Sequence, residues 1–399
     1  MNARSLTIRV AFVLLVPWTI EGNEWTGYVS TEARLFESDP AFESQKEGAS
    51  FAVVLEPEYY HEWNDGAQAI EIGLYGRLDT HDDERNLIDL RELSYLRVEN
   101  DWEIRAGISK VFWGVAESQH LVDTINQTDL VANPDGEDKL GQPMLQVTRI
   151  TSFGDFSVFL LPGFRERTLP GAEGRLRSSI PVDTDRPIYE SAAEEGHIDG
   201  ALRWFNVVGE FDIGLHYFKG TRRDPLLILD GAEGSSDPVL RPYYEQMEQV
   251  GLDLQYTRGG WLLKLEGIGR DTTSEKFSSM VSGFEYTLYG IGGSAVDAGL
   301  LVEGHFDSRG RRALTPFNRD LFVGTRLTWN DSADTALIFG GLYDLDSESV
   351  LGRFEFERRM GKSQKLEIEI QKLANIDSMD PFFSLRRDSY AQIGFSWYW

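Results

Sequence analysis

Apolar and polar residues alternate one by one along much of this 399-residue chain. The clearest run is "QKLEIEIQKL", where Leu366, Ile368 and Ile370 fall on one face of an extended strand and charged residues on the other. The final residues, "YAQIGFSWYW", alternate in the same way and place Ile393 and Trp397 on a wholly apolar face. A period of two is typical of β-strands with one apolar and one polar face, and helical periodicity is weak throughout.

Marking every such run predicts about 18 strands, an even number as bacterial outer-membrane barrels require. The predicted strands cover residues 24–37, 49–63, 67–79, 86–99, 101–111, 142–152, 154–164, 200–207, 209–219, 241–258, 260–271, 276–293, 295–307, 318–330, 333–345, 347–360, 363–374 and 388–399.

Short and long connections alternate strictly between these strands. Tight turns such as "NDGA" at 64–67 are followed by longer polar segments such as "THDDER" at 80–85. An up-and-down meander produces this pattern, whereas a Greek-key sandwich or a propeller does not. The sequence therefore predicts an all-β fold, a transmembrane up-and-down antiparallel β-barrel with short periplasmic turns and long extracellular loops.

A membrane setting explains the high aromatic content, 12%, of a chain that is otherwise polar. A sheet in hydrocarbon must close on itself to pair its backbone, so one face meets lipid and the other a wet lumen. Aromatic residues then gather at the two bilayer interfaces. The tryptophans expected in the periplasmic girdle are Trp102, Trp204, Trp261, Trp329, Trp397 and Trp399.

The N-terminus has the pattern of a secretory signal peptide, with Arg4 and Arg9 before an apolar run at 10–20 that is too short to span a bilayer. We expect a signal peptide at 1–22 and a barrel at 23–399, located in the outer membrane of a Gram-negative bacterium. The alternative is that this segment is a buried strand or helix.

Composition excludes several other classes of protein. A formal net charge of −26 argues against nucleic acid as a partner, and the absence of cysteine excludes disulfides and thiol chemistry. No hydrolase, phosphate-loop or dinucleotide motif is present, so no enzyme, cofactor or metal site is expected. His216 and His305 are predicted to point inward beside acidic residues, which leaves a barrel hydrolase as an alternative to a structural role.

The long connection at 112–141 differs from the other loops because it carries apolar residues, among them Val122 and Ile125. A segment folded into the lumen would use such residues for packing. The chain here also carries Arg-x-Gly, then Trp-Gly, then an Asn-x-x-Asp turn. The residues concerned are Arg105, Gly107, Trp113, Gly114, Asn126 and Asp129.

This stretch resembles a family of Gram-negative outer-membrane barrels that is classified as a domain of unknown function. Gln127 replaces the proline of the family's turn, and Ser109 stands where a basic residue is often found. The resemblance covers about forty residues of the chain. It implies a porin-like barrel and assigns no substrate.

Charges of both signs are interleaved on the polar faces of the predicted strands. They could hold the wall together as cross-strand pairs, or set up a field across a constriction that orients polar solutes. The predicted pore-lining residues are Arg77, Arg91, Arg105, Asp123, Asp129, Lys264, Glu266, Arg326, Arg353, Glu355, Lys365 and Glu367.

These features predict a channel for the diffusion of small polar or amphipathic solutes. The expected partners are outer-membrane lipid and lipopolysaccharide, the barrel-insertion machinery through the C-terminal strand, small solutes, and a second copy of the chain in a homo-oligomer. One alternative is a closed-lumen barrel that acts as a surface adhesin or as the outer-membrane component of an envelope export assembly. Another is a secreted all-β binding protein.

Overall fold

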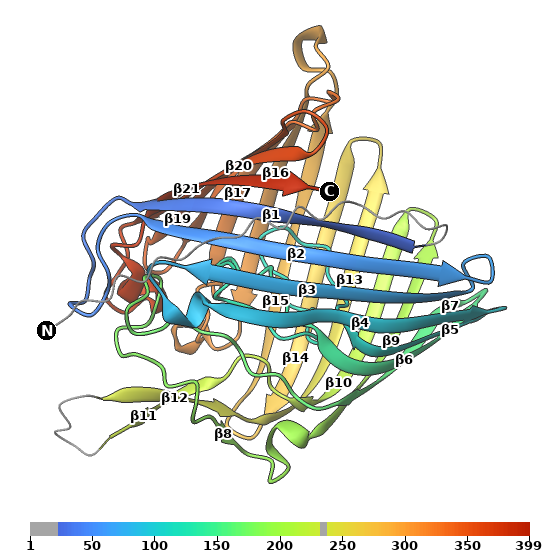
Figure 1. Cartoon of the computed structure of the whole chain (residues 1–399), viewed down its shortest axis with the longest axis horizontal. Coiled ribbons are helices and arrows are strands. Elements are labelled where there is room, and N and C mark those ends of the chain that lie inside the picture. The colour runs from blue at the N-terminus through green and yellow to red at the C-terminus, as the bar shows by residue number, and fades with distance from the viewer. Residues whose placement is uncertain (1–22, 232–237) are drawn as a thin grey trace, which may run out of the picture.

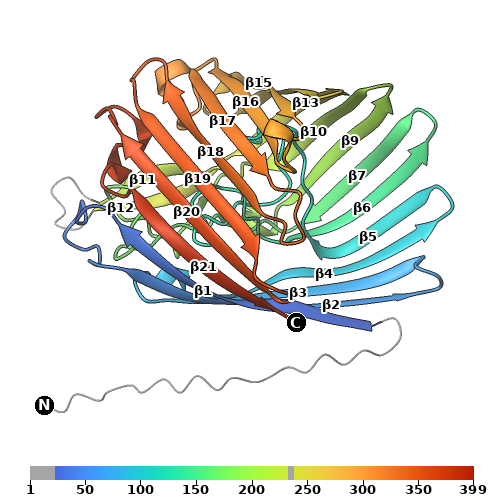
Figure 2. The same cartoon turned by 90° about the horizontal axis from the view of Figure 1, so that it is seen from above.

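The computed structural model describes residues 23–231 and 238–399. Within these residues, 18 strands form one antiparallel sheet in which each strand pairs with its neighbours in chain order. The last strand, β21, pairs with the first, β1, from Tyr28 opposite Tyr398 to Phe36 opposite Tyr390, so the sheet is closed (Figures 1 and 2). The predicted all-β barrel is confirmed, while the signal peptide expected at 1–22 lies outside the described residues.

Every predicted strand corresponds to a barrel strand, with ends that differ by a few residues. The barrel strands are β1 Asn23–Phe36, β2 Ser50–Trp63, β3 Gln68–Asp79, β4 Leu87–Glu99, β5 Trp102–Ser109, β6 Gln142–Thr151, β7 Gly154–Pro162, β9 Ile198–Val208, β10 Phe211–Thr221, β13 Gln246–Arg258, β14 Trp261–Thr272, β15 Lys276–Leu288, β16 Asp297–Asp307, β17 Asp320–Thr328, β18 Ala336–Asp344, β19 Val350–Arg359, β20 Gln364–Ala374 and β21 Tyr390–Tyr398.

The apolar face of each strand points outward, and the polar face points into the lumen. In β21, Ile393 and Trp397 are about half exposed on the outer surface, while Gly394 and Ser396 between them are buried inside. Trp25, Trp102 and Trp261 are also about half exposed near the short-turn end of the barrel, where an interfacial girdle would lie. Among the described residues, no helix is long and apolar enough to cross a membrane.

The short turns are built from residues that tolerate the left-handed backbone. In the β2–β3 hairpin, Asn64 and Asp65 have φ of 54° and 56°, and Gly66 follows with φ of 79°. Such turns match the twist of paired strands, which is why Asn, Asp and Gly dominate them. The sequence "NDGA" therefore determines where the β2–β3 hairpin turns.

The loops on the other rim hold a small second sheet that strand alternation alone did not predict. It consists of β8 Ile188–Tyr189, β11 Leu226–Asp230 and β12 Val239–Tyr244. The predicted strand at 241–258 is wrong at its start, because its first residues belong to β12 and only Gln246–Arg258 joins the barrel. The alternation runs on through the buried Glu245 between them, so the pattern could not locate the break.

Five 3₁₀ helices occur among the described residues, and they lie in the connections between strands. They are η1 Asp83–Arg85, η2 Glu194–Gly196, η3 Ile291–Gly293, η4 Gly310–Arg312 and η5 Pro381–Leu385.

The hydrophobic core lies inside the barrel rather than between two layers. Trp113, Val122 and Ile125 come from the connection between β5 and β6, and they pack against wall residues such as Phe159 and Phe218. This connection, residues 110–141, folds into the lumen and is called the inward segment below (Figure 2).

Candidate functional site

Two carboxylates of the barrel wall hold the backbone of the inward segment. Glu266 on β14 is fully buried, and its Oε1 accepts hydrogen bonds from the N–H groups of Val115 at 2.7 Å and Ala116 at 2.9 Å. Buried N–H groups need a partner, and a charged acceptor makes the stronger hydrogen bond. The wall carboxylate therefore supplies hydrogen-bond acceptors for backbone N–H groups in a stretch of chain that has no secondary structure of its own.

Glu303 on β16 does the same one step further along the segment. Its two carboxylate oxygens accept from the N–H groups of Glu117 and Ser118, each at 2.8 Å. The hydroxyl of Ser118 also lies 2.8 Å from Nε2 of His305. His305, which the sequence placed in the lumen, thus belongs to the anchoring of the segment.

The residues that carry the family resemblance have structural roles in this arrangement. The Asn126 side chain closes the base of the inward segment, donating to the carbonyls of Ser109 and Leu140 and accepting from the N–H of Val111, all at 2.9 Å. Asp129, fully buried, forms an ion pair with Arg91 of β4. These contacts fix where the segment leaves and rejoins the wall.

Trp113 and Gly114 explain the Trp-Gly pair. The Trp113 ring packs against Phe159 with centroids 5.5 Å apart, and the Arg203 guanidinium lies 4.8 Å above the ring. Gly114 has φ of +147°, and a side-chain carbon there would lie 3.0 Å from Oε1 of Glu266. Glycine lets the backbone approach the anchoring carboxylate closely.

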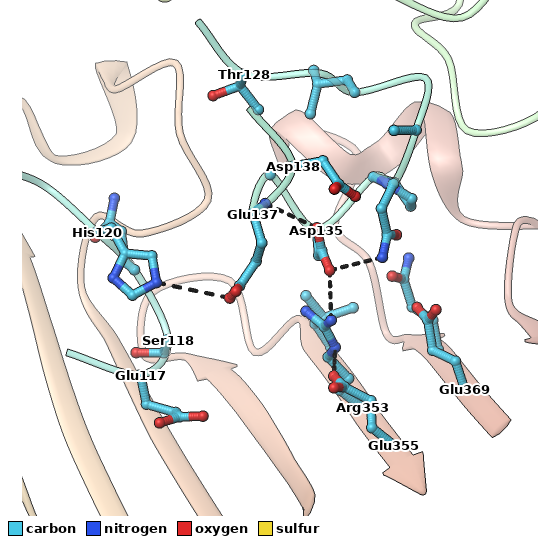
Figure 3. Close-up of a pocket in the computed structure, with 18 of the residues that line it drawn as sticks. Glu117, Ser118, His120, Thr128, Asp135, Glu137, Asp138, Arg353, Glu355 and Glu369 are labelled. Atoms are coloured by element: carbon cyan, nitrogen blue, oxygen red, sulfur yellow. Dashed lines mark hydrogen bonds and ion pairs between the residues drawn. The ribbon is translucent and has the colours of Figure 1, made fainter. Parts of the chain in front are cut away.

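The tip of the inward segment, residues 133–138, lies beside the strands that carry Arg353 and Glu369 (Figure 3). There Asp135 forms an ion pair of 2.7 Å with Arg353 on β19, and Arg353 also pairs with Glu355 on its own strand. Asp138 and Glu369 on β20 lie nearby in the same cavity lining. The tip therefore contacts the wall at Arg353, which is surrounded by carboxylates.

His120 lies at the middle of the segment between two carboxylates. Its Nε2 is 3.8 Å from Glu137 and its Nδ1 is 3.9 Å from Glu266. Burial alone lowers the pKa of His120, but these two carboxylates outweigh burial and raise that pKa to about 9. At neutral pH the imidazole is therefore a cation that neutralises part of the acidic lining.

We expect the His120 imidazole to titrate near pH 9 rather than near its ordinary value of about 6.5. NMR of the labelled imidazole carbon in detergent micelles measures this midpoint directly. Because the folded-state pKa is raised, the stabilisation from the charged imidazole is complete below pH 6.5 and is lost as pH rises through about 9.

Glu137→Gln is expected to lower the midpoint, while the matched change Glu248→Gln, on the exposed outer rim, leaves it in place. A midpoint near 6.5 in the unaltered protein would contradict this arrangement of charges.

A cavity of about 940 Å³ remains between the inward segment and the wall, and its lining residues come from β1–β3, β14–β21 and the long loops. Among the described residues that line it, acidic residues outnumber lysine and arginine by 13 to 8. Several of its carboxylates, including Asp138, Glu56 and Glu369, form no ion pair with any described residue. The cavity is therefore lined by charged groups and is net acidic.

The predicted pore-lining residues divide into two groups. Those that line the cavity are Arg77, Asp123, Arg326, Arg353, Glu355 and Glu367. Those that lie away from it are Asp129 on the inward segment itself and, in the wall, Arg91, Arg105, Lys264, Glu266 and Lys365. Many members of both groups are ion-paired: Arg77 with Glu32, Lys264 with Glu117, and Lys365 with Glu357 and Glu367.

The sequence did not point to several residues that line the cavity. Glu117, His120 and Arg167 lie on irregular segments where no periodicity marks the inward side. Glu369, by contrast, continues the inward face of "LEIEIQ" in β20, and strand alternation predicts it on the lumen wall. Groups of three or more histidine and carboxylate residues placed to hold a metal do not occur in the described part of the chain.

A closed antiparallel barrel with an apolar exterior and a charged lumen is the architecture of a porin-like protein of the bacterial outer membrane. This class follows from the barrel itself and from the half-exposed apolar residues on its outer face.

Comparison with known proteins adds likenesses of low sequence identity. No protein-family model and no curated protein matches the chain. Among solved structures, two mutants of the porin of Rh. blastica each align at 10% identity and a TM-score of 0.46, covering 94% of this chain and 100% of theirs. A loop-deletion mutant of OmpT, an outer membrane protein of Vibrio cholerae, aligns at 11% identity and a TM-score of 0.44, covering 94% of this chain and 99% of its own.

Proposed function

We propose that this chain is a non-enzymatic outer-membrane channel through which small polar or amphipathic solutes diffuse. The observation that carries the proposal is the charged cavity that remains beside the inward segment. Glu266 and Glu303 hold the backbone of the segment against β14 and β16, Asp135 at its tip pairs with Arg353 on β19, and the cavity remains between these contacts. Barrels of 16–18 strands leave an aqueous passage unless something fills it, and here the segment narrows that passage.

The charge of the cavity favours cations. Lining carboxylates outnumber lining arginines and lysines, and Arg353 is already paired with Asp135 and Glu355. Rings of Asp and Glu select cations in channels because they lower the energy of a positive ion in the constriction. The channel is therefore expected to pass potassium in preference to chloride.

One observation supports the alternative of a surface role with a closed lumen. The loops form a sheet of their own, β8, β11 and β12, beyond the barrel rim. A structured platform of this kind could bind a partner at the cell surface or in an envelope assembly.

Recordings in planar lipid bilayers separate the two functions. Steady single-channel openings, with a reversal potential in a potassium chloride gradient that indicates cation preference, are expected for the channel. Asp138→Asn combined with Glu369→Gln should reduce that preference, whereas the outward-facing pair Glu248→Gln and Asp271→Asn should not. Absence of openings from correctly folded protein would instead favour the closed-lumen alternative.

A further inference from the structure

Arginines gather at the end of the cavity toward the long loops, where Asp224 and Asp307 also line it. Its lining includes Arg167, Arg223 and Arg270. Arg270 lies two residues from the long-loop end of β14, and the other two lie on the loops that follow β7 and β10. All three therefore lie toward the long-loop rim.

Two of these arginines each pair with one carboxylate. Arg270 pairs with Asp224 at 2.7 Å and Arg223 with Asp199 at 2.7 Å. Asp224 also pairs with Arg222, and although burial favours its neutral form, Arg270 and Arg222 together lower its pKa, so that it stays ionised. Asp224 is therefore shared between two guanidinium groups, of which Arg222 also pairs with Glu245 and Glu275.

The remaining donors point to a missing anionic partner. Arg167 forms no ion pair with any described residue, and its Nε only donates to Oε1 of Gln127 at 3.3 Å. Arg223 is 5% exposed, and its Nη2 has no hydrogen-bond partner among the described residues. A buried donor without a partner is costly, and an oxyanion satisfies such a donor well.

The other end of the cavity lies near the middle of the barrel. Its lining includes carboxylates that form no ion pair with any described residue. Glu56 on β2 and Glu369 on β20 stand near the centres of their strands, and Asp138 stands on the tip of the inward segment. Glu56 accepts a hydrogen bond from the Tyr28 hydroxyl and Glu369 one from the Tyr390 hydroxyl. None of the three carboxylates forms an ion pair with a described residue.

We propose that the cavity binds solutes that carry a carboxylate and an ammonium group on one molecule. The carboxylate lies toward Arg167, Arg223 and Arg270, and the ammonium group lies toward Glu56, Asp138 and Glu369. This inference rests on the proposed channel function, since solutes reach the cavity only through the lumen. The solute carboxylate pairs with the arginines and the solute ammonium group pairs with the carboxylates. A solute with one charge can make only one of these two sets of contacts.

The test uses a matched series of six-carbon solutes: ε-aminohexanoate with both charges, ω-hydroxyhexanoate with the negative charge, ω-aminohexanol with the positive charge, and neutral hexanediol. Each is titrated against single-channel current, and the dissociation constant is taken from current block. Burial in the lumen and the neighbouring Asp135 and Asp129 raise the pKa of Asp138 to about 6, so the titrations are run near pH 8. We expect ε-aminohexanoate to bind most tightly.

Two variants test which end of the cavity binds which charged group of the solute. Arg167→Gln should weaken binding of ε-aminohexanoate and ω-hydroxyhexanoate by about tenfold, because each loses a hydrogen bond to a charged group, and should leave ω-aminohexanol unchanged. Asp138→Asn should weaken binding of ε-aminohexanoate and ω-aminohexanol and should leave ω-hydroxyhexanoate unchanged. The matched controls Arg186→Gln and Glu248→Gln, both on the exposed surface, should change neither.

The outcomes separate this inference from the channel itself. Equal dissociation constants for the four solutes, or a loss in Arg167→Gln that is the same for all of them, would overturn the two-ended site while the channel still conducts. No conductance in any variant, including the unaltered protein, would overturn the proposed function and the inference with it.

Discussion

Deleting residues 115–138 and joining the ends with a short glycine–serine linker should increase single-channel conductance several-fold. The strands on either side, β5 and β6, pair directly with each other from Trp102 to Ser109, so the barrel does not need the segment to close. What remains is an 18-stranded barrel with a wider lumen, lined by wall side chains and by loop residues such as Arg167 and Phe317. Conductance follows the open cross-section.

The comparison requires proof that the shortened barrel folds. Heat-modifiable migration in detergent gels and an unchanged β-sheet signal in circular dichroism provide it. A folded deletion variant with unaltered conductance would show that solutes do not pass beside the inward segment. Loss of potassium preference should accompany the wider pore, because Asp135, Glu137 and Asp138 leave with the tip.

Leu202→Arg is expected to destabilise the barrel by about 2–4 kcal/mol, since Leu202 lies near the middle of β9 and is half exposed on the outer face. An arginine there must enter the centre of the hydrocarbon layer. Urea unfolding in lipid vesicles, followed by tryptophan fluorescence, measures the change in free energy of unfolding.

The same substitution at Val208, at the short-turn end of the same strand and equally exposed, is the control for depth. Near the interface the cost falls to about 0–1 kcal/mol. Equal destabilisation at the two positions would mean that the outer face of β9 does not cross a bilayer.

The fold could be predicted because alternation in a barrel strand is a local property. Each residue of β20 or β21 faces either lipid or lumen, so its polarity is set by its own environment and not by a distant partner. The small sheet of β8, β11 and β12 could not be predicted in this way. Its strands are short, and they pair loops that lie far apart in the sequence, Ile188 with Tyr243 for example.

The candidate site was only partly accessible from the sequence. Inward-facing charges such as Arg353 and Glu355 follow from strand alternation, and both line the cavity. Glu266 was expected on the pore wall for the same reason, yet the structure places it under the inward segment, where it accepts backbone hydrogen bonds. No pattern in residues 110–141 says which wall carboxylates the segment will cover, because that depends on contacts between residues about 150 apart.

The seam between β1 and β21 has a consequence for how this protein folds. Tyr28 and Tyr398 become neighbours only when the final strand has been made, so the ring is sealed by the contact with nearly the greatest possible separation along the chain. Contacts of such long range slow folding, because the entropy of bringing distant segments together is lost before the contact forms. Until that moment two strand edges stay unpaired and prone to aggregate, so the unsealed chain needs protection while it travels to the membrane.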